Sequence, residues 1–289
     1  MWQTLLEHCS EDRLNKYLDK VAEDQLAAEF LYVANQKVSE SLYQLISVLE
    51  VSLRNRVHTK LHDKFGRTDW WTHSDLNIHA FQGSLDRVDR AKSKLFHRID
   101  SITKKHQVKA GQIVAEVSFN FWTDLFSEGL QAVLWKDLMD CFPHLPQEAR
   151  KRRKVAKPLD NLAKLRNRVM HHEPILFDET VLPSMHTKGT ELVSWMSPEM
   201  VSWLAKRDRF PAVWREYQEP LAQMHVWLRA RAELKQAREA GKAGKDLKPF
   251  YQAVEAAKNT FDELANQYLL NAKTAETAPQ VSKQASVPV

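Results

Sequence analysis

An apolar stripe over residues 39–65 constrains the fold of this chain more than any other feature of its sequence. Apolar residues recur there at helical spacing, namely Leu42, Leu45, Ile46, Leu49, Leu53, Val57 and Leu61. This pattern predicts one long α-helix with a single buried face, which must pack against other elements. Phe65 and Gly66 follow the stripe, and glycine is the usual residue just past the end of a helix.

Most of the remaining sequence also favours helices. Further helical stretches are expected at residues 10–36, 75–107, 111–141, 147–172, 212–239 and 247–271. Ser197 followed by Pro198 is typical of another helix start. The chain has only seven glycines in 289 residues, which argues against sandwiches, barrels and glycine-loop nucleotide folds. We therefore expect an all-α helical bundle, with a short hairpin near residues 176–193 as its one strand element.

The composition also indicates where such a protein would reside. The two cysteines, Cys9 and Cys141, are too few for a disulfide framework or a cysteine-based zinc site, which fits a reducing cytoplasm. An apolar run of about eighteen residues is lacking, and so is a basic-then-apolar N-terminal segment, so we expect neither a membrane span nor a signal peptide. The net charge of +5 is modest, so the placement of the charges matters more than their sum.

The positive charges concentrate in one segment. Residues 150–168 contain nine Lys or Arg residues and a single acid, Asp160. A run of this kind forms either a solvated helix face or a surface that binds phosphates. Under the second interpretation the RNA-binding residues are Arg150, Lys151, Arg152, Arg153, Lys154, Lys157, Lys164 and Arg168.

The end of this basic run carries residues suited to cutting RNA without a metal. Arg166 and Asn167 are followed by His171 and His172. The 2′-hydroxyl of RNA is itself a nucleophile, so a site needs a group that moves protons near neutral pH and a cation that stabilises the phosphorane oxygens, roles that suit His and Arg. Asn167 and His171 share a helix face, whereas about 140° of rotation separates Arg166 from His171. The alternative is a capped helix end, where the C-terminal dipole favours the imidazoles.

The same residues carry a resemblance to a known family. Arg166-Asn167-x-x-x-His171 resembles the R-polar-x(3)-H signature of HEPN-superfamily ribonucleases, and LRNRVMHHEPIL at 165–176 resembles their Abi-like, abortive-infection branch. Further blocks that resemble this branch occur in the same order along residues 10–215, at 49–55, 65–71, 121–127, 134–143 and 194–204.

This resemblance implies an α-helical HEPN domain over residues 1–215 that cleaves RNA without metal and acts in phage defence or as a toxin, with an antitoxin as a further partner. Arg166 and His171 would be catalytic and Asn167 supporting, with His172 as the alternative imidazole. A catalytically inactive HEPN bundle that binds RNA or a protein partner is the main alternative, and a purely structural helical scaffold is another. Residues 216–271 are expected to add a helical hairpin, and 272–289 a disordered tail.

The resemblance also implies a homodimer. One copy of the 166–172 segment supplies few proton-handling groups, whereas a two-fold dimer would bring two copies around one phosphate. The residues from Phe250 to Tyr268 form an apolar seam for a neighbouring helix, and we expect this seam to add to the dimer interface.

Two smaller groups allow more than one interpretation. Glu50, Arg54 and His58 lie four residues apart on the helix predicted at 39–65, where Glu50 and Arg54 can form an intrahelical ion pair. Alternatively, Glu50, Arg54 and Asn55 line the same cleft as the candidate catalytic residues. His58, His62 and Asp63 have zinc-ligand spacing but lack a further strong ligand nearby, so we expect no metal or cofactor.

The tryptophans are expected to fill the core, with one or two left to stack on unpaired bases. The set comprises Trp70, Trp71, Trp122, Trp135, Trp195, Trp203 and Trp214.

Overall fold

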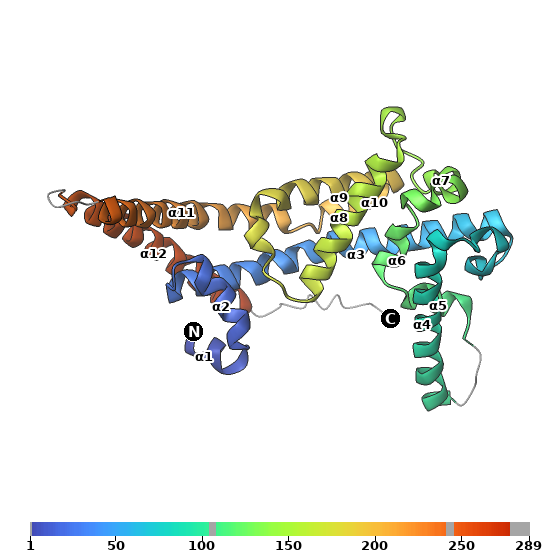
Figure 1. Cartoon of the computed structure of the whole chain (residues 1–289), viewed down its shortest axis with the longest axis horizontal. Coiled ribbons are helices and arrows are strands. Elements are labelled where there is room, and N and C mark those ends of the chain that lie inside the picture. The colour runs from blue at the N-terminus through green and yellow to red at the C-terminus, as the bar shows by residue number, and fades with distance from the viewer. Residues whose placement is uncertain (1, 104–107, 241–245, 278–289) are drawn as a thin grey trace, which may run out of the picture. The chain divides into compact units, whose positions relative to one another are not determined.

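The computed structural model describes residues 2–103, 108–240 and 246–277, and the regular structure in these ranges is helical throughout (Figure 1). Twelve α-helices, α1 to α12, and several short 3-10 turns occur there, without a strand. The all-α prediction is therefore confirmed for the described residues. The helices form two compact units, one made of Met1–Glu40 with Arg209–Val289 and the other of Ser41–Asp208.

The stripe at 39–65 belongs to α3 (Gln25–Phe65), whose predicted stripe residues are all buried. The helix ends at Gly66, which adopts a φ of +67° and donates its N–H to the carbonyl of His62. The prediction of one helix at 10–36 and another at 39–65 was wrong about where the first helix ends. The chain breaks instead between α2 (Glu11–Lys20) and α3, where Ala22 and Glu23 take left-handed conformations, because no helix breaker separates 36 from 39.

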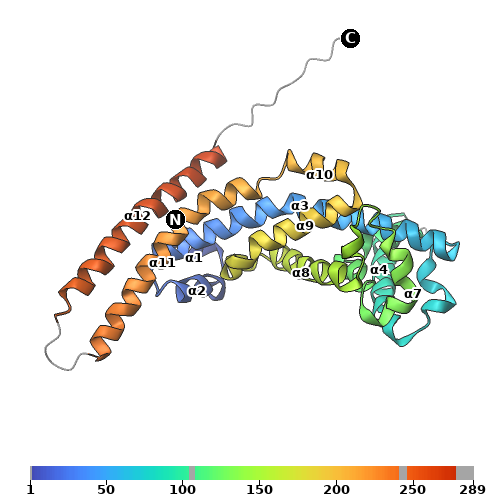
Figure 2. The ribbon, with the colours of Figure 1, turned by 90° about the horizontal axis from the view of Figure 1, so that it is seen from above.

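The first unit contains α1 (Trp2–His8), α2, the start of α3, α11 (Phe210–Ala240) and α12 (Lys248–Thr277). The last two helices run side by side in opposite directions (Figure 2). Phe30 lies at the centre, with ring centroids 5.6 Å from Tyr217, 5.8 Å from Phe261 and 5.2 Å from Tyr268. The predicted seam on α12 is thus buried at Phe261 and Tyr268 against residues of the same chain, so these two rings are not available to a dimer interface.

The boundary expected at 215 and 216 lies within α11, and the N-terminal forty residues belong to the same compact unit as the C-terminal helices. Helix α12 extends to Thr277, beyond the end predicted at 271, and Ala272 is buried. Residues 278–289 of the expected tail lie outside the described residues.

The second unit contains the rest of α3 and seven shorter helices. These are α4 (His79–Thr103), α5 (Ala110–Glu116), α6 (Phe119–Asp124), α7 (Gln131–Met139), α8 (Arg152–Met170), α9 (Leu182–Met196) and α10 (Pro198–Ala205). Trp70 is the hub of an aromatic cluster, with ring centroids 6.4 Å from Phe81, 6.1 Å from Phe121 and 6.4 Å from Trp122. Phe121 and Trp122 belong to α6, which is in contact with α8.

The hairpin expected near 176–193 is absent from the structure, which has a 3-10 turn at Ile175–Val181 and then α9. Pro183 stands in the first turn of α9, where its missing N–H costs no hydrogen bond. A Cβ on Gly189 would lie 2.8 Å from Leu45 Cδ2, so glycine is needed there for α9 to approach α3 closely. Pro183 therefore suits the start of α9 and Gly189 its packing on α3, rather than a hairpin turn.

The tryptophans mostly fill the core, as expected. Trp70, Trp71, Trp122 and Trp195 are buried, while Trp135 and Trp214 are half-buried. Trp203 is 43% exposed, and the guanidinium of Arg207 lies 4.1 Å from its ring centroid.

Burial raises the pKa of the Cys141 thiol to about 12, so this group stays protonated. Cys9 Sγ lies 3.3 Å from the Tyr32 hydroxyl, and both cysteines are free. Across the described ranges, every helix is too short or too polar to cross a bilayer.

Candidate functional site

The predicted site residues lie at the C-terminal end of α8, which closes in a Schellman motif. His172 donates its N–H to the carbonyl of Val169 at 3.1 Å, and Glu173 donates to that of Arg168 at 2.9 Å. The motif requires a left-handed residue, and His172 fills that place with a φ of +54°. Glycine is the usual residue here, because a side chain adds steric cost. One of the two candidate imidazoles therefore belongs to the turn that ends the helix.

Arg166 is directed toward α3, where it meets Glu50. Its Nε donates to Glu50 Oε2 at 3.1 Å and its Nη2 to Oε1 at 3.5 Å, so the guanidinium grips the carboxylate as a fork. The two side chains are 27% and 21% exposed. Within the described part of the chain Nη1 has no partner, so two N–H donors remain for a ligand.

Asn167 joins α8 to α6. Its Nδ2 donates to Asn120 Oδ1 at 3.1 Å, and the backbone carbonyl of Asn120 accepts from Arg87 of α4 at 3.5 Å. Arg87 is also ion-paired with Asp124. The amide of Asn167 is thus held by a chain of contacts that crosses three helices. The sequence analysis did not identify Asn120. The signal that could have found it is its place as the one polar residue within Phe-Asn-Phe-Trp, where a partly buried amide needs a hydrogen-bond partner.

His171 is the first residue past α8 and is exposed to solvent. Its backbone N–H donates to the carbonyl of Asn167 at 2.9 Å, which keeps it in helical register with that residue. Arg166, five residues earlier, projects about 140° away around the helix axis. No hydrogen bond joins the side chains of Arg166 and His171 among the described residues. A single copy of the chain therefore presents the two groups on different sides of the helix end.

Several of the predicted RNA-binding cations already have partners in the fold. Arg152 is only 12% exposed and donates to Gln131 Oε1 at 2.9 Å, to the carbonyl of Phe126 at 3.1 Å and to Glu128 Oε2 at 3.4 Å. This side chain fastens the start of α8 to the segment around α7.

Other cations of the run are held locally. Arg168 donates to the carbonyl of Pro174 at 2.8 Å, which stabilises the turn after α8. Lys164 pairs with Asp160 at 2.8 Å, and Arg150 donates to the carbonyl of Leu145 at 3.4 Å.

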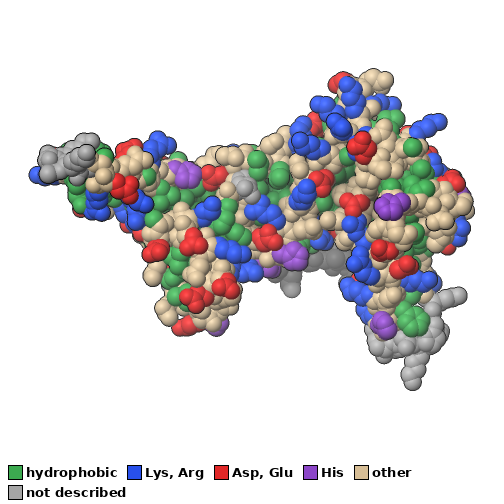
Figure 3. Space-filling view, in the orientation of Figure 1, with side chains coloured by type: hydrophobic (Ala, Val, Ile, Leu, Met, Phe, Trp, Pro, Cys, Tyr) green, Lys and Arg blue, Asp and Glu red, His purple; other side chains and the backbone are tan. Residues whose placement is uncertain are grey.

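The remaining cations are exposed and unengaged. The side chains of Lys151, Arg153, Lys154 and Lys157 make no hydrogen bond or ion pair with any described residue. Lys and Arg side chains gather over the N-terminal end of α8 in the space-filling view (Figure 3). The part of the basic run that is free to bind phosphates is therefore its beginning.

The residues Glu50, Arg54 and Asn55 on α3 have different partners. The Glu50 carboxylate bonds Arg166 of α8, so it does not form the intrahelical pair with Arg54. Arg54 Nε instead donates to Asn55 Oδ1 at 3.4 Å on the exposed side of α3. Of the three residues, the structure brings Glu50 to a candidate catalytic residue.

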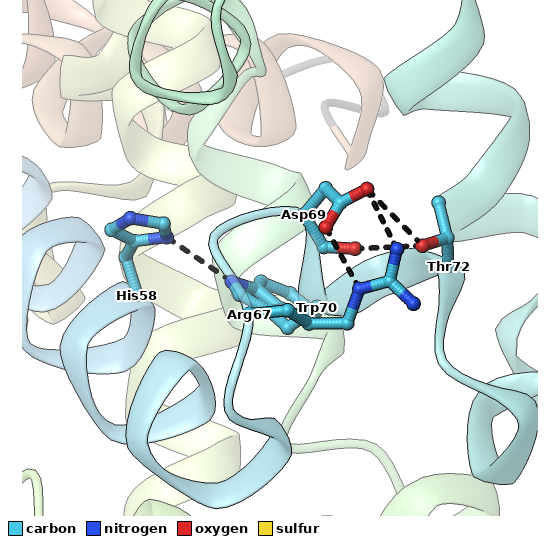
Figure 4. A network of polar contacts seen from close by, with 5 residues as sticks. All are labelled: His58, Arg67, Asp69, Trp70 and Thr72. Atoms are coloured by element: carbon cyan, nitrogen blue, oxygen red, sulfur yellow. Dashed lines mark hydrogen bonds and ion pairs between the residues drawn. The ribbon is translucent and has the colours of Figure 1, made fainter.

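His58 has a structural partner in the loop that follows α3. Trp70 Nε1 donates to His58 Nδ1 at 3.1 Å, beside a fork between Arg67 and Asp69 (Figure 4). Burial lowers the pKa of His58, with a smaller contribution from His62, which keeps the imidazole neutral and able to accept this bond. Among the described residues no three His, Cys, Asp or Glu side chains gather as a metal site would require.

Known proteins give no independent guide to this site. No protein-family model, curated protein or solved structure matches the chain. The chemistry of the α8 end is therefore judged from its own residues: a partly buried arginine fork with two free donors, a supporting amide, and an exposed imidazole at the helix terminus.

Proposed function

We propose that this protein is a HEPN-type endoribonuclease of Abi-like character that cleaves RNA without a metal in the cytoplasm, as a phage-defence or toxin-type effector. The observation that carries the proposal is the Arg166–Glu50 fork at the same helix end as the exposed His171. Glu50 fixes the guanidinium and leaves two N–H donors on Nη1, which is the arrangement that stabilisation of a phosphorane oxygen requires.

In the proposed reaction His171 accepts the proton of the RNA 2′-hydroxyl, or donates one to the leaving 5′-oxygen. The 2′-oxygen forms a bond to phosphorus while the bond from phosphorus to the 5′-oxygen breaks. The products are a 2′,3′-cyclic phosphate and a 5′-hydroxyl. Single-stranded loops are the expected substrates, because only splayed RNA adopts the in-line geometry.

A homodimer would complete the site. Since Arg166 and His171 project from different sides of one helix end, two copies of the 166–172 segment around a two-fold axis would surround one phosphate with both groups. Light scattering on the purified chain tests this part of the proposal. A strict monomer that cleaves RNA would contradict the composite site.

The nuclease itself is tested with the full chain and a single-stranded RNA in excess EDTA. Wild-type protein should cleave and leave 2′,3′-cyclic phosphate ends, while Arg166→Ala and His171→Ala should not. Lys92→Ala, an exposed change on α4, is the matched control. Cleavage that needs Mg²⁺, or that survives both site substitutions, would refute the mechanism.

An inactive HEPN bundle that binds RNA or a protein partner such as an antitoxin is the second candidate. It is favoured by the structural use of Asn167, Arg168 and His172, each of which has a contact that holds the helix end. RNA binding without any cleavage by the wild-type chain would select this function.

A further inference from the structure

A groove of about 450 Å³ lies along the first half of α8, away from the candidate site at the C-terminal end of this helix and within the 41–208 unit. It is bordered by the first half of α8, the 3-10 turn at Gln147–Ala149 and the facing side of α9. Helices α8 and α9 lie along one another in Figure 2, and the groove runs between the first half of α8 and a face of α9 from Ser184 to Trp195. None of the groups assigned to catalysis lines it.

The walls of the groove carry more positive than negative charge, with the cations Arg153, Lys154, Lys157 and Lys188 against the carboxylates Glu148 and Glu191. Arg153, Lys154 and Lys157 line one wall, and each lacks a hydrogen-bond or ion-pair partner among the described residues. Lys188 on the other wall is paired with Glu191 at 2.6 Å. Three cations without a direct partner outnumber the one carboxylate of the lining that is also unpaired among the described residues, Glu148, which leaves a net attraction for an anion.

The floor of the groove is apolar. This term denotes the apolar part of the lining, which comprises Pro146, Ala149, Pro158, Leu162, Met185 and Trp195. Asn161 and Ser184 add an amide and a hydroxyl to the lining. An occupant that matches these surfaces has a flat apolar part, hydrogen-bonding edges and a negatively charged end.

We infer that this groove binds one ribonucleotide, with its base against the apolar floor and its phosphate on the α8 cations. A groove of this volume falls within the range for small-ligand sites, roughly 300–1,000 Å³, and fits a single nucleotide rather than a folded protein segment. Arg153 and Lys157 present N–H donors one helical turn apart, which suits a phosphate group.

The groove and the proposed nuclease site lie on the same helix, α8. The suggestion that the bound nucleotide is part of an RNA strand rests on the proposed function. Arg153 and His171 are separated by about five helical turns, or about 27 Å along the axis, so both project from the same side of α8. An RNA strand that follows this side would place one base in the groove and a later phosphate near His171. A free nucleotide has the same base and phosphate and is therefore the alternative ligand.

The test uses calorimetric titration of the full chain with AMP, GMP, CMP and UMP, and separately with inorganic phosphate. The wild-type chain should bind at least one nucleotide about tenfold more tightly than phosphate, because the base adds apolar contact. Lys154→Ala with Lys157→Ala should weaken nucleotide binding about tenfold. Ser184→Trp should abolish it by filling the groove without any change of charge, and Ser184 is exposed enough to accept the larger side chain.

The control is Lys92→Ala with Lys136→Ala, which removes the same charge from exposed positions on α4 and α7. Nucleotide binding should survive this change within about twofold. Nucleotide binding that is no tighter than phosphate binding, or that is unchanged by Ser184→Trp, would overturn the assignment of this groove as a nucleotide site. The groove would also be overturned as a nucleotide site if the chain bound polyglutamate but none of the nucleotides. That result would favour an acidic protein partner.

The two sources are separated with a short single-stranded RNA bound to His171→Ala protein, which cannot cut it under the proposed mechanism. If Ser184→Trp weakens RNA binding as well as mononucleotide binding, the nucleotide belongs to an RNA strand. If only mononucleotide binding falls, the ligand is a free nucleotide. Because binding is measured without turnover, absence of cleavage by the wild-type chain would refute the nuclease while leaving the groove intact.

Discussion

The two ends of α8 use the same kinds of residues in opposite ways. At its start, Arg153 and Lys157 are exposed and unengaged, whereas at its end Arg166 and Arg168 are tied to other elements. Even neighbours differ, because Arg152 makes three contacts and is nearly buried. The number of cations in a basic run therefore does not tell how many of them can reach a phosphate.

Helical phase explains the difference. The buried face of α8 contains Val155, Leu159, Leu162 and Val169, at steps of three, four and seven. Arg152 and Arg166 continue this stripe in phase, so their stems run into the core and their guanidinium groups meet partners on neighbouring segments. Arg153 lies one residue out of phase and points to solvent. The two cations in phase with the apolar stripe, Arg152 and Arg166, therefore serve the fold. Of those out of phase, Arg153 and Lys157 remain free for ligands, whereas Lys164 and Arg168 are held by the nearby Asp160 and Pro174.

The largest expected effect contrasts the two imidazoles at the end of α8. His171→Ala should lower the rate of RNA cleavage about 10²–10⁴-fold, because the exposed imidazole moves the proton. His172→Gly should leave the rate close to that of the wild type, since this residue serves the helix-ending turn. Single-turnover cleavage of a labelled RNA measures both. A greater loss from the change at 172 would assign catalysis to the other imidazole.

The next effect contrasts the neighbours Arg152 and Arg153. Arg152→Ala should lower the free energy of unfolding by about 2 kcal/mol, because it leaves the carbonyl of Phe126 without its donor and removes a nearly buried stem. Arg153→Ala should change it by less than about 0.5 kcal/mol, as expected of an exposed side chain. Urea unfolding followed by tryptophan fluorescence gives both values.

For RNA binding, the substitution of Arg153 should have the larger effect and that of Arg152 the smaller one. Arg153→Ala should weaken binding and reduce the salt dependence by about one phosphate contact, as a free cation would. Equal loss of binding from both substitutions, at equal stability, would contradict the division of the basic run into structural and ligand-binding cations.

How far the sequence predicts this molecule depends on the kind of information each feature needs. The buried face of α3 follows from periodicity alone, so every residue of the stripe from Leu42 to Leu61 is buried as predicted. The break before α3 depends on left-handed Ala22 and Glu23, which have no strong preference for such a turn. Local patterns predict helices well, but not where two unmarked residues interrupt them.

The candidate site divides in the same manner. Its position at the end of a basic helix follows from the spacing of Arg166 and His171 and from Pro174 beyond it. Its contacts do not, because Glu50 and Asn120 reach it from segments 116 and 47 residues away. Such pairings are set by tertiary packing, which the periodicity of a single helix does not contain.

A smaller effect is expected from the turn itself. His172→Gly should raise the free energy of unfolding by about 0.5–1 kcal/mol, because glycine adopts the left-handed conformation without steric cost. His171→Gly is the matched control. It should be destabilising, because His171 has a negative φ of −93°, where glycine offers no steric advantage and loses more conformational freedom on folding. Thermal unfolding of both variants tests this. Destabilisation by the change at 172 would mean that its side chain contributes more than its conformation costs.

The smallest effect concerns Lys164, whose pair with Asp160 follows the favourable order of acid before base at i and i+4. The two side chains are 68% and 56% exposed, so solvent and salt weaken their attraction. Lys164→Met should therefore lower the free energy of unfolding by about 0.3–0.5 kcal/mol at low salt. The matched change Lys157→Met removes an unpaired cation from the same helix and should have no such cost.

A double-mutant cycle with Asp160→Asn isolates this pair from changes in helix propensity. The coupling energy should fall toward zero in 1 M salt, where the Debye length is about 3 Å. A coupling that persisted at high salt would mean that the pair is shielded from solvent. In that case Lys164 would belong with Arg152 and Arg166 among the cations that hold α8 in place.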